Sequence, residues 1–220
     1  MTRLHQYRGN RIITAPASEP VTATELRDYL RTNTSDLPDT EANALIAEAR
    51  QLIEDQTGIA MIDQTWLLAL DHWPSAHEPW WDGTRQAHVN VIHGGDGDVR
   101  PPRYPLSSIS GVNVYDEDGN ATAVTVADTF DIDTYQMPGR MTLQRGASWP
   151  VALRANNAIE ITYIAGYGAS ASSVPAPLKR AVKQLAGYLY ANRGDGCDMG
   201  SALADSGVGG VLSAYAVRQV

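Results

Sequence analysis

The spacing of apolar residues changes twice along the chain, and this change limits the fold to helices near both ends with strands between them. Apolar residues recur every three or four positions in residues 23–57 and again in residues 174–193. From Ala60 to about residue 165 they alternate in short runs separated by Pro, Gly, Asn and Asp. We therefore predict an α+β fold. A small helical bundle formed from N-terminal and C-terminal helices carries a large antiparallel β-rich insertion, at about residues 60–165, and an extended C-terminal tail.

Three helices are predicted, at about residues 23–31, 40–57 and 176–193. Thr22 stands three residues before Glu25, which is the spacing of a capping box at the start of the first helix. Gly58 suits the end of the second helix, because glycine adopts positive φ without strain. The third helix has an apolar stripe made of Leu178, Val182, Leu185 and Leu189.

Strands are predicted near residues 11–14, 65–72, 88–92, 109–115, 121–126, 130–133, 141–144 and 158–164. Asp118 and Gly119 form a hairpin-turn signal between two of them. We take residues 1–193 as a single domain. Residues 194–220 are rich in Gly, Ala and Ser, so they are predicted to be an extended tail, and a chain ending at Arg193 should keep nearly all its stability.

Composition and charge exclude several functions. The chain carries 17 Lys and Arg against 25 Asp and Glu, a formal net charge of −8. That balance does not favour nonspecific binding to nucleic acid or to an anionic membrane. No apolar run reaches the length of a membrane span, and the N-terminus lacks the apolar segment of a signal peptide. Because the single Cys197 excludes an intrachain disulfide, we expect synthesis and assembly in a reducing host cytoplasm.

We predict no catalytic residue, cofactor or metal, because neither G-x-S-x-G nor H-E-x-x-H occurs and no other catalytic set can be assembled. One group has the chemistry of metal ligands and consists of His72, His77, His88, His93, Asp82, Asp96 and Asp98. We interpret it as solvated side chains of a long hairpin or loop. Asp116, Asp118 and Asn120 resemble part of a calcium loop, but the glycine and closing glutamate are misplaced, so we predict a turn.

Three tryptophans, Trp73, Trp80 and Trp81, occur in the long segment between residues 73 and 103. Large rings in such a loop either close over the sheet or anchor a partner, and the sequence favours neither interpretation.

Six segments in a fixed order carry a resemblance to a known family. They are PVTATELRDYLR (Pro20–Arg31), EARQLIEDQTG (Glu48–Gly58), QTWLLALDHWP (Gln64–Pro74), YPLSSISGVNVYDEDG (Tyr104–Gly119), ITYIAGYG (Ile161–Gly168) and VPAPLKRAVKQLAGYLYANR (Val174–Arg193). In this order the chain resembles the head-to-tail adaptor (head-completion connector) proteins of long-tailed bacteriophages and gene transfer agents. The resemblance covers residues 20–193, most of the chain.

The resemblance implies a structural protein of the virion neck. In that family, identical subunits form a twelve-fold ring beneath the portal protein, extend the DNA channel and dock the next neck (stopper) or tail protein. Genomic DNA passes through the lumen without sequence-specific binding. Family tails often end in a proline-tyrosine-arginine pattern that reaches the portal. Here Ala214, Tyr215 and Ala216 take that place, so only the tyrosine carries over.

Two sets of residues are our candidates for contact. The set for portal binding is Val211, Leu212, Tyr215, Val217 and Arg218. The set for the subunit or neck interface is Trp80, Trp81, Lys179, Arg180 and Lys183. The three basic residues are expected to pair with Glu41, Glu48 or Asp55 of the next subunit.

Two alternatives stay open at this point. One is a β-rich hydrolase or carbohydrate-binding module that uses the His- and Asp-bearing loop at residues 72–98. The other is a tail-completion protein, which would share most of these features and differ in its position in the particle.

Overall fold

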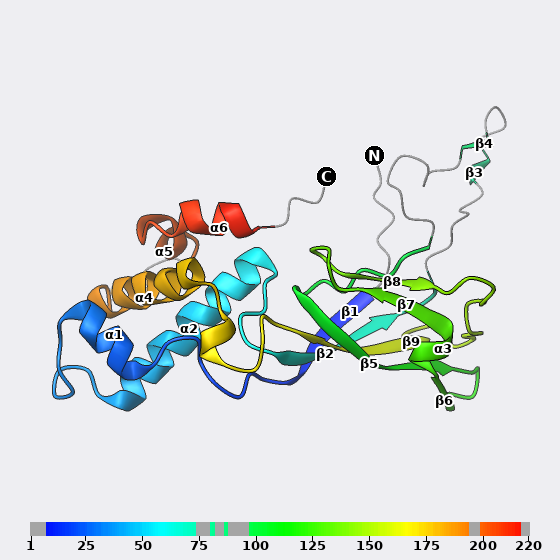
Figure 1. Cartoon of the computed structure of the whole chain (residues 1–220), viewed down its shortest axis with the longest axis horizontal. Coiled ribbons are helices and arrows are strands. Elements are labelled where there is room, and N and C mark those ends of the chain that lie inside the picture. Colours follow the sequence, from blue (N-terminus) through cyan, green and yellow to red (C-terminus); the bar gives the residue numbers. More distant parts are fainter. Residues whose placement is uncertain (1–7, 74–79, 82–85, 88–96, 194–198, 217–220) are drawn as a thin grey trace. The chain divides into compact units, whose positions relative to one another are not determined.

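The computed structural model describes residues 8–73, 80–81, 86–87, 97–193 and 199–216, and it has the predicted α+β fold (Figure 1). The chain divides into two compact units. We call residues 14–64, 103–107 and 165–220 the helical unit, and residues 1–13, 65–102 and 108–164 the sheet unit. Both units draw on distant parts of the sequence. The single domain predicted for residues 1–193 stays a prediction.

The helices of the helical unit are α1 (Ala23–Leu30), α2 (Asp39–Thr57), η2 (Ala171–Ser173), α4 (Ala176–Ala191), α5 (Met199–Asp205) and α6 (Gly209–Tyr215). The predicted capping box starts α1. The Glu25 amide donates to Thr22 Oγ1 at 3.2 Å, and the Thr22 amide donates to Glu25 Oε2 at 2.8 Å. Gly58 ends α2 with φ of +81°, as predicted.

The core of the helical unit lies where α1, α2 and α4 pack on one another. The apolar face of α2 is buried there through Ile46 and Ile53, each with no exposed surface. On α4 the predicted stripe is buried at Leu178, Val182 and Leu185, whereas Leu189 is half-buried. Apolar residues at helical spacing therefore build this bundle.

Residues 199–216 correct the prediction of an extended tail. They form α5 and α6, which pack against α2 and α4 and bury Ala202, Val208 and Leu212 in the same core. Gln184 of α4 donates from Nε2 to the carbonyl of Ser206 at 2.6 Å, between the two helices. Helices this short draw their stability from tertiary packing rather than from a local period, which is why the sequence pattern missed them.

The largest sheet has five strands in the order β1 (Arg8–Thr14), β2 (Gln64–Leu70), β9 (Ile159–Ala165), β5 (Leu106–Tyr115) and β6 (Ala121–Val124). Two small sheets pair β3 (Trp80–Trp81) with β4 (Gln86–Ala87), and β7 (Phe130–Asp133) with β8 (Arg140–Leu143). β5 and β6 run antiparallel, with Val112 opposite Val124. α3 (Val126–Thr129) follows β6 where a longer strand was predicted. The strand predicted at residues 88–92 lies outside the described residues.

Leu185→Asp tests the burial of α4. A charge placed at this fully buried position should lower the free energy of unfolding by roughly 3 to 5 kcal/mol. Arg180→Ala, on the exposed side of the same helix, should change it by about 0.5 kcal/mol or less. Urea unfolding followed by circular dichroism measures both, and equal midpoints for the two variants would contradict the burial.

Removal of residues 194–220 should now destabilise the helical unit, contrary to the expectation from sequence. Leu212 is 5% exposed, so Leu212→Ala alone should cost about 2 to 3 kcal/mol. Ser213→Ala, at the exposed neighbour, should cost about 0.5 kcal/mol or less. A chain ending at Arg193 that unfolds at the same urea concentration as the full chain would show that α5 and α6 contribute nothing to the core.

Candidate interaction surfaces

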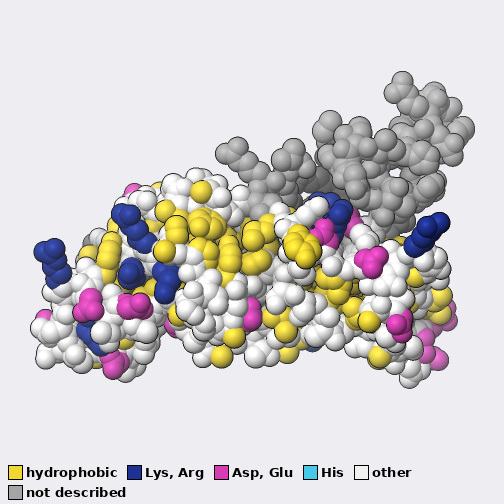
Figure 2. All heavy atoms as spheres, viewed as in Figure 1, with side chains coloured by type: hydrophobic (Ala, Val, Ile, Leu, Met, Phe, Trp, Pro, Cys, Tyr) yellow, Lys and Arg dark blue, Asp and Glu magenta, His cyan; other side chains and the backbone are white. Residues whose placement is uncertain are grey.

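The predicted basic row lies on α4 beside α1. Arg180 is exposed, while Lys179 and Lys183 are half-buried. The Lys183 ammonium lies 5.9 Å from the centroid of the Tyr29 ring. The pKa of Glu25 is lowered, first by the hydrogen bond from the Thr22 amide and to a smaller extent by the nearby charges of Lys179 and Lys183. Figure 2 shows Lys and Arg side chains next to Asp and Glu side chains where Figure 1 draws α4 and α1.

Two of the three acidic residues proposed as partners of this row already have partners in their own chain. Glu41 accepts from Arg193 at 3.2 Å, and Asp55 accepts from Arg103 at 2.6 Å. Glu48 is exposed, and no ion pair involves it within the described residues. Pairing of the basic row with the next subunit stays a prediction, and Glu48 is the proposed partner for which the described residues show no competing ion pair.

The candidate portal-binding residues divide into three groups. Leu212 is buried in the core of the helical unit, so it is not available as an anchor while α6 is docked. Val211 and Tyr215 are half-buried on α6 and expose part of their apolar surface. A band of hydrophobic side chains is visible in Figure 2 at and below the position of α6. Val217 and Arg218 lie outside the described residues. Their role in portal binding stays a prediction.

The tryptophans differ in what the structure describes. Trp73 stacks on Trp149 with 4.6 Å between ring centroids, and its Nε1 donates to the carbonyl of Pro150 at 2.7 Å. Phe130 completes this aromatic cluster at 5.8 Å from both rings. For Trp73, closing over its own unit is therefore the correct interpretation. Trp80 and Trp81 form β3, with their backbones opposite Ala87 and Gln86, and their side chains lie outside the description.

The candidate metal ligands at residues 72–98 are only partly described. His72 is exposed, and Asp98 accepts from Arg100 at 2.7 Å. The remaining five, His77, Asp82, His88, His93 and Asp96, lie outside the described residues. Across the part of the chain that is described, no three His, Cys, Asp or Glu residues are grouped so as to hold a metal ion.

The segment from Asp116 to Asn120 is a turn, as predicted. The Asn120 amide donates to Asp116 Oδ1 at 2.8 Å, and Gly119 has φ of +84°. Hydrogen bonds from the Asn120 side chain and backbone lower the pKa of Asp116. The carboxylate thus holds its own loop.

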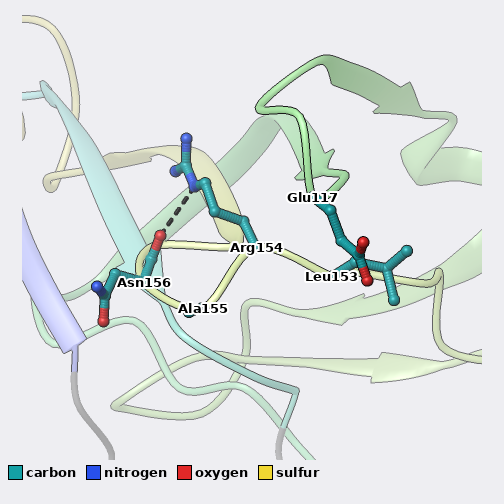
Figure 3. A pocket seen from close by; sticks show the side chains of 5 residues that line it. All are labelled: Glu117, Leu153, Arg154, Ala155 and Asn156. Carbon is teal, nitrogen blue, oxygen red and sulfur yellow. Dashed lines mark hydrogen bonds between the residues drawn. The ribbon is translucent and has the colours of Figure 1, made fainter.

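An open hollow of about 540 Å³ lies in the sheet unit (Figure 3). It is lined by Glu117, Leu153, Arg154, Ala155 and Asn156. Its one arginine donates from Nε to the carbonyl of Asn156 at 2.8 Å and also donates to the carbonyl of Asn157. The guanidinium lies 3.9 Å from the centroid of the Tyr115 ring. Arg154 therefore holds the loop in place, and the lining offers no paired nucleophile and base.

Among the described residues of the helical unit, Glu54 has the most buried carboxylate. It accepts hydrogen bonds from Arg50 Nη1 at 2.7 Å, from the Met61 amide at 2.8 Å and from Gln64 Nε2 at 2.9 Å. Burial raises the pKa of Glu54, while the Arg50 charge and the hydrogen bonds from Met61 and Gln64 oppose that rise. Arg50 in turn contacts Glu19 at 2.7 Å.

A raised pKa, such as that of the Glu54 carboxylate, is common among catalytic residues. Both oxygens of Glu54, however, accept hydrogen bonds from donors of its own chain. We therefore assign it a structural role. Sequence reasoning missed it, although the signal was present. Arg50 and Glu54 follow Ile46 at intervals of four residues and so lie on the apolar face of α2.

Within the described residues, no helix is both long enough and apolar enough to cross a membrane.

No protein-family model matches the chain, and no curated protein matches it. Chains of several solved structures have a similar fold. One is from the neck of an empty gene transfer agent (GTA) particle computed with C6 symmetry, with a TM-score of 0.68 and 23% identity. A second is from the virion of a native GTA particle, with a TM-score of 0.67 and 23% identity. A third is from the neck of a native GTA particle computed with C12 symmetry, with a TM-score of 0.65 and 22% identity. Each match covers 96% of this chain and 97% of the other.

Glu54→Gln tests the structural role of the buried network. The amide would place an N–H group against Arg50 or Gln64, both of which donate, so the free energy of unfolding should fall by about 3 kcal/mol. Asp55→Asn is the matched control, because the side chain of Asp55 is 72% exposed and its ion pair should be worth about 1 kcal/mol or less. Urea unfolding at neutral pH measures both variants. Equal losses would show that Glu54 is no more important than its exposed neighbour.

Proposed function

We propose that this protein is a structural subunit of the neck of a phage-like particle and acts there as the head-to-tail adaptor. The observation that carries the proposal is the fold similarity to chains of GTA necks, because it extends over 96% of this chain. A match of that extent includes both units, so a single shared module does not account for it. No enzymatic activity is part of the proposal.

The proposed assembly is a twelve-fold ring beneath the portal protein. Support comes from the order of the six sequence segments and from the C6 and C12 symmetries named for the similar neck structures. In this arrangement the ring extends the DNA channel and docks the next neck or tail protein. The net charge of −8 suits a channel that lets DNA pass without retaining it. The subunits assemble in the host cytoplasm and end up in the virion neck.

The contacts are assigned by exposure. On α6, Val211 and Tyr215 keep apolar surface available to the portal while Leu212 anchors the helix to its own core. Arg180 has the most exposed position of the basic row and is assigned to the neighbouring subunit or the next neck protein. We extend the adaptor domain proposed for residues 1–193 to include α5 and α6, because their side chains complete its core.

A tail-completion protein is the second candidate from the sequence. Its position in the particle, rather than its residues, would distinguish it from an adaptor. An electron-microscopy map of assembled necks decides between them, since the adaptor contacts the portal. A single asymmetric copy in such a map would contradict the ring.

Tyr215→Ala tests the portal contact. The protein should co-sediment with filled, portal-bearing heads, and the variant should bind roughly five- to thirtyfold more weakly, the effect of losing a 1 to 2 kcal/mol contact. Ser213→Ala, exposed on the same helix, is the control and should bind like the wild type. Both variants are first checked for unchanged thermal unfolding. Equal recovery of all three proteins would exclude α6 as the portal contact, and no recovery of the wild type would contradict the adaptor function.

A further inference from the structure

The five-stranded sheet ends in two unlike edges. β1 has β2 on one side only, and β6 has β5 on one side only, among the strands that the structure describes (Figure 1). An edge strand presents a row of unpaired backbone N–H and C=O groups, which is a template for pairing with another chain. The sheet unit therefore offers two such templates, and their side chains differ.

β1 is exposed along its described side chains. All residues from Gly9 to Thr14 are exposed, and Ile12 and Ile13 are 44% and 52% accessible. Successive residues of a strand point to opposite faces, so each face of β1 presents an isoleucine to water. Exposed β-branched residues on an open edge favour association, and natural proteins avoid them where no partner exists. The composition of β1 thus indicates a strand that has a neighbour in the assembled state.

β6 is a suitable neighbour. Its four residues, Ala121 to Val124, include no charge and no proline, and Ala121, Thr122 and Ala123 are exposed. Small side chains leave space for the larger side chains of an incoming strand. β5 extends six residues beyond its pairing with β6, from Leu106 to Gly111, so the sheet has further length on this side.

The charges beside the two edges are opposite. β1 carries Arg11, which is exposed, and no acidic residue. The turn that precedes β6 carries exposed Glu117 and Asp118. Two copies joined by unlike edges would bring these charges together, whereas two β1 edges would bring arginine against arginine. Charge complementarity therefore favours a second copy of this chain as the partner, with β1 of one copy beside β6 of the other.

We propose that β1 of one copy pairs with β6 of the next, so that the sheets of neighbouring subunits join edge to edge around the ring. This inference rests on the proposed function, since it specifies the contact that closes the adaptor ring. A contact between two different surfaces is heterologous and propagates from copy to copy until the ring closes. The ladder itself is short, so it acts within a larger subunit contact.

The width of the sheet makes the contact testable by disulfide cross-linking. β1 and β6 are separated by four strand spacings, about 19 Å in total. A disulfide requires Cα atoms within about 7 Å. Cysteines on β1 and β6 therefore cannot be joined within one chain, and any disulfide between them links two copies.

The experiment uses Ile12→Cys and Ala123→Cys in a Cys197→Ser chain. Because the register is open, Ile13→Cys and Ala121→Cys are paired in the same way. Oxidation is carried out on concentrated protein and on protein recovered with portal-bearing heads. The double variant whose two cysteines lie opposite each other in the β1–β6 pairing should give a ladder of multimers on a denaturing gel. A mixture of the two single variants should stop at dimers, and each single variant alone should stay monomeric. Ile12→Cys combined with Tyr135→Cys controls for random collision, because Tyr135 is 99% exposed and belongs to neither edge strand.

Charge reversal supplies a second measurement. Arg11→Glu should lower the cross-linking yield roughly two- to fivefold, as expected for a surface ion pair, and Glu117→Arg in the same chain should restore it. Dimers from a single variant would overturn the proposal in favour of pairing between like edges. If the double variants bind heads but give no ladder in any register, this inference fails and the adaptor function stands. If no variant or wild-type protein binds heads, the adaptor function fails, and a ladder in solution still decides the edge pairing.

Discussion

The buried carboxylate of Glu54 is the interaction on which the helical unit depends. It joins the last turns of α2 to the segment that follows, because the Met61 amide and the Gln64 side chain both donate to it. An ionised group in this position requires a full set of donors, since an unmatched buried charge costs several kcal/mol. The backbone from α2 to the start of β2 is therefore held in the conformation that brings the Met61 and Gln64 donors to Glu54. Apolar packing alone would hold α2 against its neighbours without defining that conformation.

Gly58 stabilises the same segment after α2 because its lack of a side chain lets Tyr104 approach closely. A Cβ at this glycine would lie 2.9 Å from Cε1 of Tyr104, and its φ of +81° is strained for other residues. The close approach lets Ile59 bridge to Tyr104, with the Ala60 amide donating to the Tyr104 carbonyl at 2.8 Å. The Tyr104 hydroxyl donates to the carbonyl of Thr57. Residues nearly fifty positions apart thus complete the C-terminus of α2, where carbonyl groups lack helical partners.

These two features show where sequence reasoning succeeds and where it stops. Gly58 and the Thr22 capping box were predicted because helix ends are encoded by neighbouring residues. The apolar stripe of α4 and the alternation of β9 were predicted because each period is local. α5, α6 and the Tyr104 contact were missed because their stability comes from residues distant in the sequence. At the surfaces, the sequence indicated Lys179 and Tyr215 as polar or amphipathic candidates. It did not indicate that the charge of Lys179 helps to lower the pKa of Glu25, or that Leu212 anchors the helix that carries Tyr215.

Net charge limits how copies of this chain can associate. Each carries a formal charge of −8, so copies repel one another at long range, and a ring needs contacts that do not depend on attraction between whole molecules. Backbone ladders meet that need, since their hydrogen bonds require no net charge. Exposed basic groups such as Arg11 and Arg180 can meet it where they face the acidic side of a neighbour. Glu41 and Asp55 have basic partners in their own chain, which reduces repulsion between copies. An acidic protein can therefore form a ring provided that its positive charge and open strand edges lie at the subunit boundary.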